Sequence, residues 1–207
     1  RYALYEVTTD ALLVPTRGAD WGDNGRWRKL HSHDWGLEET DILTPFDQFN
    51  SNQLLASQIL DSRSGASTDV AAQARFLRAY SMFTILDLFG QVPYRDTNLS
   101  SSALPEVLSG ATAVDFILSD LDAAISGLAS VGAGTGDLKK VSKEAAMMLK
   151  AKVLLNRHIF DNQLAIAAGG AIPAPAAGDM QAVISLVDDI TSAGYALETG
   201  YFEIFER

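Results

Sequence analysis

The sequence predicts an all-α fold built from antiparallel helix hairpins with long irregular insertions, and three observations support this prediction. Apolar residues recur at spacings of three and four in five long segments. Glycine and proline residues separate these segments, and no stretch alternates apolar with polar residues for long enough to indicate a sheet. Because each expected helix carries a single apolar stripe to bury, stacked antiparallel hairpins are the natural arrangement.

The first 40 residues differ from the rest of the chain. They contain all three tryptophans, two of the three histidines and four glycines, but little helical periodicity. We therefore expect an irregular segment over residues 1–40 and a helical region over residues 41–207, which together form one domain. With 207 residues, 47% of them apolar, the chain is long enough to bury a sizeable core without disulfide bonds.

The first two expected helices follow this segment. The first begins at Thr44-Pro45, because threonine can cap a helix and proline is tolerated at the first helical position, and it ends near Ser62. The second runs over residues 68–89, after which Gly90 supplies a left-handed cap and Pro93 prevents continuation. Its apolar stripe consists of Ala72, Phe76, Ala79, Phe83 and Leu86.

Three further helices complete the expected set. One starts at Thr112 with Asp115 as a capping-box partner, one extends from Ser142 toward His158, and one spans residues 179–193 before Gly194. Their apolar stripes are Val114, Ile117, Leu118, Leu121, Ile125 and Leu128 in the first, Ala145, Ala146, Leu149, Val153 and Leu154 in the second, and Met180, Val183, Ile184, Val187 and Ile190 in the third.

The second helix also carries a pattern typical of helical repeats. Ala79 and Phe83 stand four residues apart, and this small–aromatic pairing packs one helix of a tetratricopeptide hairpin against its mate. The distances between successive helix starts are irregular. We therefore predict degenerate, tetratricopeptide-like hairpins with inserted loops rather than a consensus repeat.

Composition and charge exclude several classes of function. The chain has 26 acidic and 16 basic residues, and its net charge of −10 disfavours sequence-independent binding to nucleic acid. It has no cysteine, which excludes a thiol nucleophile, a disulfide framework and cysteine-held zinc or iron–sulfur centres. No apolar run reaches the 18 residues of a transmembrane helix, and no signal peptide is visible.

Charge is also sorted along the chain. Residues 96–138 contain no lysine or arginine, whereas basic residues gather over residues 139–157. Solvated helix faces would explain this sorting, and so would a surface of complementary potential for a docking partner. The sequence does not distinguish these two interpretations.

The densest group of recognition-type residues lies between Pro15 and Arg28. Tryptophan rings offer flat faces to the C–H face of a sugar ring, and planar polar side chains can hydrogen-bond its hydroxyl groups. Glycines in the same segment let the backbone turn sharply. We therefore take as candidate ligand-binding residues Arg17, Asp20, Trp21, Asp23, Asn24 and Trp27. The alternative is that these tryptophans, like Trp35, only anchor an irregular segment onto the helices.

Metal-binding and catalytic patterns are weak. His31 and His33 lack a third ligand, so capping and packing are the simpler interpretation, and the run from Asp20 to Gly25 lacks the ligand spacing and distal glutamate of a calcium loop. There is no nucleophile elbow and no phosphate-binding loop. The carboxylate pairs Asp120/Asp122 and Asp188/Asp189 are expected to face solvent. We predict no metal, no cofactor and no catalytic residue.

Two stretches resemble the SusD/RagB family. The run Ala74-Arg75-Phe76-Leu77-Arg78-Ala79-Tyr80, followed by Phe89-Gly90-Gln91-Val92-Pro93-Tyr94, closely resembles the signature of that family. The segment from Thr9 to His33 is similar to the region between its first helices. Further similar positions recur in the family's order, and these are Phe116, Ile117, Asp120, Leu121, Lys143, Ala145, Ala146, residues 182–195, Tyr201 and Phe205.

This resemblance implies a non-enzymatic, glycan-binding lipoprotein on the surface of the outer membrane. Such proteins deliver oligosaccharides to a SusC-like TonB-dependent transporter, and a lipid attached to an N-terminal cysteine anchors them. They are about twice as long as this chain, so it would be one domain truncated at both ends, with its membrane contact through an anchor outside this sequence. The core residues implied are Phe76, Ala79, Phe83 and Phe89, with Gly90 and Pro93 in a structural turn. Arg78 and Tyr80 would face a neighbouring helix or the transporter.

Three hypotheses follow. The leading one is a surface lipoprotein that binds an oligosaccharide or a polysaccharide fragment and serves the transporter. The second is a tetratricopeptide-like scaffold that binds only protein. The third is a glycosidase with carboxylates that the sequence pattern does not reveal.

Overall fold

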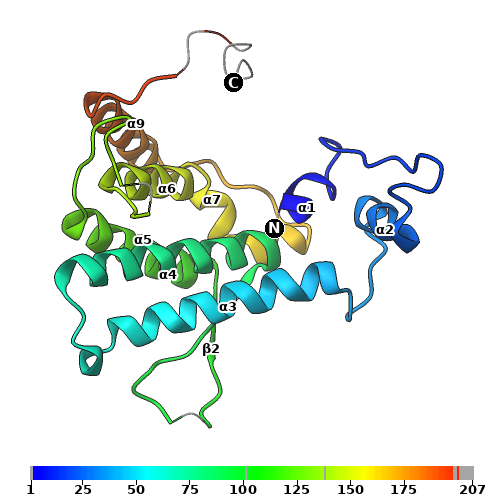
Figure 1. The fold of residues 1–207 in the computed structure, drawn as a ribbon, viewed down its shortest axis with the longest axis horizontal. Coiled ribbons are helices and arrows are strands. Elements are labelled where there is room, and N and C mark those ends of the chain that lie inside the picture. Colours follow the sequence, from blue (N-terminus) through cyan, green and yellow to red (C-terminus); the bar gives the residue numbers. More distant parts are fainter. Residues whose placement is uncertain (1, 101, 138, 198–199, 201–207) are drawn as a thin grey trace. The chain divides into compact units, whose positions relative to one another are not determined.

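A computed structural model describes residues 2–100, 102–137, 139–197 and 200, arranged in two compact units, residues 1–51 and 52–207 (Figure 1). The division between these two units falls inside a long helix, α3 (Thr40–Leu60). Tyr201 and Phe205, which the resemblance includes, lie outside the described residues. Among those that are described, no helix has both the length and the apolar character needed to cross a bilayer.

The first unit contains short helices that the sequence did not predict. These are α1 (Tyr2–Glu6), the 3-10 helix η1 (Asp23–Gly25) and α2 (Arg26–Ser32), followed by the first half of α3. Their small core is formed by Leu4, Val7 and Leu30, all buried. The segment expected to be irregular is therefore partly helical, but its helices are too short to show a period in the sequence.

The first long helix begins earlier than predicted. Helix α3 starts at Thr40 and carries Pro45 inside it, so Thr44-Pro45 is not its start. Asp41 in its first turn receives a bidentate pair of hydrogen bonds from Arg26 of α2. This ion pair at the positive end of the helix stabilises the first turn.

The second long helix, α4 (Thr68–Phe89), confirms the prediction at both ends. The Ser67 hydroxyl accepts a hydrogen bond from the Val70 N–H at the N-terminus. Gly90 adopts a left-handed φ of 76° at the C-terminus. Between α3 and α4 lies the short 3-10 helix η2 (Ser62–Ser64).

A short β-hairpin follows α4, where the sequence indicated no sheet. Strands β1 (Gln91–Tyr94) and β2 (Glu106–Ser109) are antiparallel, and Val92 pairs with Leu108 in their buried centre. The Gln53 side-chain amide of α3 donates to the Pro93 carbonyl. Four residues are too few to show alternation, which explains why the sequence pattern missed this hairpin.

The remaining helices are α5 (Gly110–Gly127), α6 (Lys143–Leu155), α7 (Arg157–Phe160), α8 (Gln163–Ala167) and α9 (Ala177–Ser192). Helix α4 packs against α5, α5 against α6, and α6 against α9, and these helices lie in a stack in Figure 1. The predicted all-α architecture is confirmed. The expected fourth helix ends at Leu155, before His158, and continues only as the separate turn α7.

The predicted capping box of the third helix is wrong. Helix α5 begins two residues before Thr112, and Asp115 instead accepts a hydrogen bond from Arg157 at 2.7 Å. Gly110 has a φ of 52°, and a Cβ there would lie 2.9 Å from the Asp161 carbonyl oxygen. The true start therefore depends on a contact between segments far apart in the sequence.

One cluster in the core of the second unit consists mainly of alanines. Ala72, Ala124, Leu128 and Ala146 are buried together, and Phe76 packs against them. Ala79 is fully buried, and Phe83 makes an edge-to-face contact with Phe160 at 5.3 Å between ring centroids. Phe89 and Pro93 are half-buried, and Gly90 is buried.

Two predicted apolar stripes differ from what the structure shows. Ala145 of α6 is exposed, whereas its neighbour Ala146 is buried. On α9 only Ile190 of the predicted stripe is buried, while Ile184 and Val187 are exposed. Helix α9 packs mainly against α6, and the described residues bury only a narrow part of its apolar face.

The prediction that Asp120 faces solvent is wrong, since this residue is only 2% exposed. Arg78 donates from Nε and Nη2 to its carboxylate at 2.6 and 2.8 Å, and Arg75 donates at 2.8 Å. Arg78 also donates to the Ser57 hydroxyl and stacks over the Phe116 ring. Arg78 therefore faces neighbouring helices α3 and α5, and Asp120 neutralises its charge in the core.

Candidate functional site

The segment from Arg17 to Gly25 has unusual backbone geometry. Trp21, Asp23 and Asn24 adopt positive φ values of 59°, 39° and 52°, which side-chain-bearing residues rarely take. Such conformations cost of order 1–3 kcal/mol each and cluster at ligand sites. Arg17 and Asp20 close a tight turn through two backbone hydrogen bonds of 3.1 and 2.9 Å.

Trp27 is held by two neighbours. Its indole Nε1–H donates to the Asp23 carboxylate at 2.5 Å, and the Arg26 guanidinium lies 4.7 Å from its ring centroid. Arg26 is itself held by Asp41, and the hydrogen bond that it donates to that carboxylate is the main reason why the pKa of Arg26 is raised. The Trp27 ring is thus committed to contacts within the protein.

Trp21 has the opposite character. Its side chain is 57% exposed, and its ring lies 6.2 Å from that of Trp27 at an angle of 56°. Trp27 therefore supports one part of Trp21 and leaves most of its surface open to a ligand. An exposed indole on a rigid support is the arrangement that stacking against a sugar ring requires.

Three of the six candidate residues surround one pocket. Arg17, Trp21 and Trp27 line a pocket of about 500 Å³ whose other walls are aliphatic. These walls come from Ala3, Val7, Leu12, Leu13, Val14 and Pro15. The aliphatic contribution of residues 12–15 was missed in the sequence, where this run showed only as an apolar segment of no clear period.

The other three candidates lie elsewhere. Asp23 and Asn24 line a second, polar pocket of about 550 Å³, together with Arg26, Lys29 and Glu39. Asp20 is exposed and lines neither of these two pockets. Five of the six residues therefore divide between an apolar pocket that bears the tryptophans and a polar pocket that bears Asp23 and Asn24.

The two histidines of the N-terminal unit do not converge. His33 Nε2 lies 2.6 Å from the Thr8 carbonyl oxygen, and its ring contacts Trp35 at 5.3 Å between centroids. His31 is exposed. Within the described part of the chain, no three histidine or carboxylate side chains are placed to hold a metal ion.

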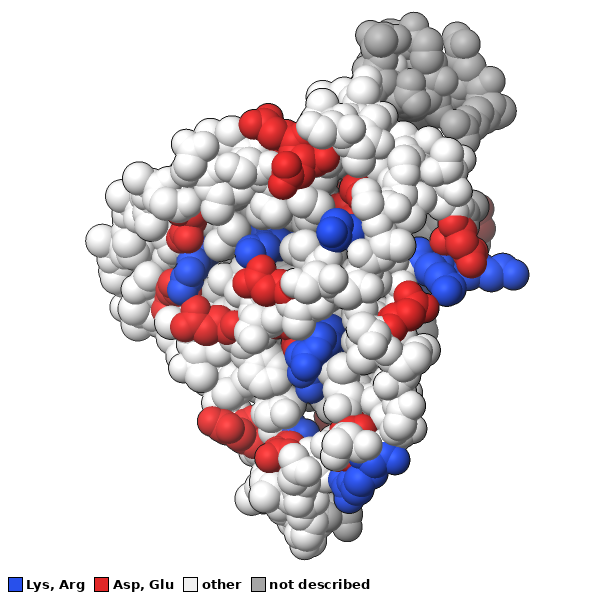
Figure 2. Space-filling model, turned by 90° about the vertical axis from the view of Figure 1, so that its left-hand side faces the viewer, with Lys and Arg blue, Asp and Glu red and all other residues white. Residues whose placement is uncertain are grey.

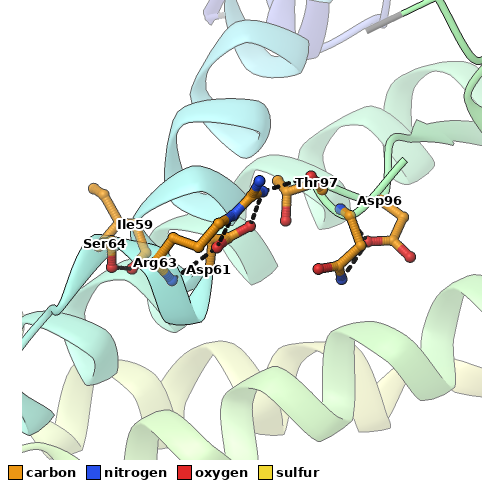
Figure 3. A network of polar contacts seen from close by, with 7 residues as sticks. Ile59, Asp61, Arg63, Ser64, Asp96 and Thr97 are labelled. Atoms are coloured by element: carbon orange, nitrogen blue, oxygen red, sulfur yellow. Dashed lines mark hydrogen bonds and ion pairs between the residues drawn. The ribbon is translucent and has the colours of Figure 1, made fainter. Parts of the chain in front are cut away.

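A separate polar network lies at the corner between α3 and η2. The Arg63 guanidinium forms a fork with Asp61 and donates to the Thr97 carbonyl at 2.8 Å, as Figure 3 shows. These hydrogen bonds hold the pKa of Asp61 well below its usual range. The network lines a pocket of about 690 Å³, but Arg63 and Asp61 already satisfy each other's charge there.

The sorted charges of the sequence meet across helices. Lys150 pairs with Asp122, and Arg157 pairs with Asp115 at 2.7 Å, so basic residues of α6 and α7 neutralise acidic residues of α5. On the face in Figure 2, red and blue side chains lie interspersed rather than in separate patches. These pairs favour solvated helix faces over a docking surface of a single sign.

The fold resembles that of several solved proteins. One was crystallised with a xylogluco-oligosaccharide; it is 20% identical, and the match covers 90% of this chain and 36% of that one with a TM-score of 0.70. A SusD-like protein from Bacteroides fragilis is 20% identical over 84% of this chain and 32% of its own, with a TM-score of 0.63. A SusD-like carbohydrate-binding protein from the same species is 18% identical over 98% and 42%, with a TM-score of 0.56.

These similarities establish that the chain has a SusD-like fold, as its sequence motifs predicted. The chain spans about a third of the length of the first of these structures. No protein-family model matches the chain, and no curated protein matches its sequence.

Proposed function

We propose that the chain binds an oligosaccharide at the pocket formed by Arg17, Trp21 and Trp27. The observation that carries this proposal is the exposed Trp21 indole, supported by a fixed Trp27 at the edge of an apolar pocket. The sugar's C–H face would stack on Trp21. Arg17, Asp23 and Asn24 would hydrogen-bond its hydroxyl groups at either side.

The SusD-like fold supports a wider role in nutrient uptake. In this role the full-length protein is a lipid-anchored component of the outer-membrane surface and passes its glycan to a SusC-like TonB-dependent transporter. The chain binds the glycan without hydrolysing it.

Native electrophoresis in gels that contain a polysaccharide tests the binding step. Xyloglucan, starch and β-glucan are suitable probes, and we expect at least one of them to retard the wild-type chain and not the Trp21→Ala variant. Alanine keeps a Cβ at the same positive φ, so this substitution removes the ring without changing the backbone requirement. Retardation of the Trp21→Ala variant equal to that of the wild-type chain with every polysaccharide that binds would contradict the proposed site, whereas weaker but remaining retardation would not.

The transporter step needs its own experiment. We expect the full-length lipoprotein to co-purify with an outer-membrane TonB-dependent transporter after mild detergent extraction. Co-purification without retention by any polysaccharide would favour the protein-binding scaffold instead. Release of reducing ends from a retained polysaccharide by the pure protein would favour a glycosidase.

A further inference from the structure

A further pocket, distinct from the three described above, lies entirely within the unit of residues 52–207. Its volume is about 800 Å³, and it lies between the start of α4, the loop that follows α5, and Tyr195 after α9. The residues that matter for its chemistry are Asp69, Gln73, Phe76, Asp137, Lys140 and Tyr195. None of them belongs to the tryptophan site.

The loop that walls this pocket is pinned at both ends. At its start, the buried Glu144 accepts hydrogen bonds from the Val131 N–H at 3.1 Å and from the Ser130 hydroxyl. At its end, the Gln73 amide donates to the Val141 carbonyl at 3.0 Å and accepts from the Val141 N–H at 2.9 Å. Helices α4 and α6 thus set the position of the loop before any ligand arrives, which reduces the entropy lost on binding.

Two aromatic residues line the pocket. Phe76 packs against the buried cluster of alanines and Leu128, and the Tyr80 ring stacks on the Phe76 ring with 6.1 Å between centroids. These two contacts fix the position of the Phe76 ring. Tyr195 is half-buried, and its hydroxyl forms no hydrogen bond with the residues that the structure describes. The pocket therefore offers apolar ring surface and one unused hydroxyl group.

The charged groups of the pocket largely balance. Lys140 pairs with one carboxylate oxygen of Asp69 at 3.2 Å, and one oxygen of Asp137 accepts the Lys139 N–H at 3.0 Å. The second oxygen of each carboxylate forms no hydrogen bond within the described part of the chain. Two acceptors and an ammonium donor beside aromatic rings suit a neutral, polyhydroxylated ring better than an ion or an apolar ligand.

From this combination we infer that the pocket is a second sugar-binding site, independent of Trp21. Tyr195 and Phe76 contact the C–H face of a sugar unit. Asp69 and Asp137 accept its hydroxyl hydrogens, and Lys140 donates to a hydroxyl or ring oxygen. The pinned loop positions Asp137, and the first turn of α4 positions Asp69.

Calorimetric titration of the 207-residue chain tests this inference in a Trp21→Ala background, which removes the first site. Xylogluco-oligosaccharide, maltoheptaose and cellohexaose serve as probes. We expect Trp21→Ala to retain binding of at least one probe, and Tyr195→Ala added to it to weaken that binding at least tenfold. Tyr195→Phe, which keeps the ring, should lose less. The matched control is Leu197→Ala, because Leu197 is 96% exposed in the same segment.

The outcomes separate the two sites. If the wild-type chain binds a probe but Trp21→Ala binds none, the second site is overturned and the first stands. If Tyr195→Ala behaves like Leu197→Ala in the Trp21→Ala background, the second site is overturned. If Tyr195→Ala abolishes binding and Trp21→Ala does not, the second site stands and the first falls. If the wild-type chain binds no probe, both are overturned. Circular dichroism of each variant verifies the fold.

Discussion

At the scale of single residues, the structure distinguishes side chains that are held by contacts within the protein from side chains that are exposed and could contact a ligand. Trp27 and Trp21 are six positions apart and of the same type, but the first is held by Asp23 and Arg26 while the second is exposed. The sequence identified both as candidates but could not rank them. Their difference depends on Asp41, whose contact with Arg26 bridges 15 positions.

Asp120 provides the sharpest prediction on stability. Replacing it with asparagine leaves the buried Arg78 without its charge partner, which costs about 3–5 kcal/mol when one partner of a buried ion pair is removed. Asp122→Asn is the matched control, because its pair with Lys150 is exposed and contributes about 0–1 kcal/mol. Urea denaturation of both variants measures the free energies of unfolding, and equal losses would contradict the assigned role of Asp120.

At the scale of elements, helix ends that depend on neighbouring residues could be predicted from the sequence. Helix ends and burial that depend on contacts between distant segments could not. Helix α4 was predicted at both ends, because its left-handed cap at Gly90 follows directly from the neighbouring sequence. Helix α5 was misplaced, since its start at Gly110 depends on a close approach to Asp161. The burial of Asp120 was missed for the same reason. Its partners are on another helix, 42 and 45 positions away.

The packing of α4 against α5 gives a second prediction. A Cβ at Gly127 would lie 2.8 Å from the Ala72 Cβ, so Gly127→Ala overpacks this contact and should destabilise the fold by about 1–3 kcal/mol. Gly178 in the first turn of α9 has no atom within 4 Å of such a Cβ. Gly178→Ala should therefore be neutral or stabilising by up to about 1 kcal/mol. Thermal unfolding of the two variants measures the difference, and similar melting temperatures would refute the assignment.

The pinned loop after α5 gives a prediction on pH. Burial alone would raise the pKa of Glu144, but hydrogen bonds from Ser130 and Val131 outweigh it and hold the pKa below its usual value. A lowered pKa in the folded state means that ionised Glu144 adds stability above its unfolded pKa, and that this stability is lost as the pH falls through the folded pKa.

Glu144→Gln should therefore be less stable than the wild-type chain at pH 7, and the gap should narrow as the pH falls below about 4.5. Urea denaturation at a series of pH values measures this gap. A gap of constant size across the series would show that the charge of Glu144 contributes nothing. The exposed Glu38→Gln serves as a control with no expected pH-dependent gap.

At the scale of the whole molecule, the chain combines a SusD-like helical stack with a tryptophan-bearing segment whose residues the sequence identified as candidates for recognition. The structure brings Arg17, Trp21 and Trp27 to one pocket and places Asp23 and Asn24 at another. The residue types led us to propose a sugar as the ligand. They did not reveal how the residues divide between the two pockets, because backbone turns and contacts with α3 decide that division.

The most direct test of this account is a calorimetric measurement of affinity for an oligosaccharide. The oligosaccharide is a fragment of the polysaccharide that retards the chain most in the gel, and two tryptophan variants are compared. Trp35 packs on His33 and lines neither pocket of the N-terminal unit, so Trp35→Ala should change the affinity less than twofold. Trp21→Ala should lower the affinity of the first site at least tenfold, a loss of about 1.4 kcal/mol or more. Equal affinities for the two variants would contradict the claim that Trp21 binds the sugar.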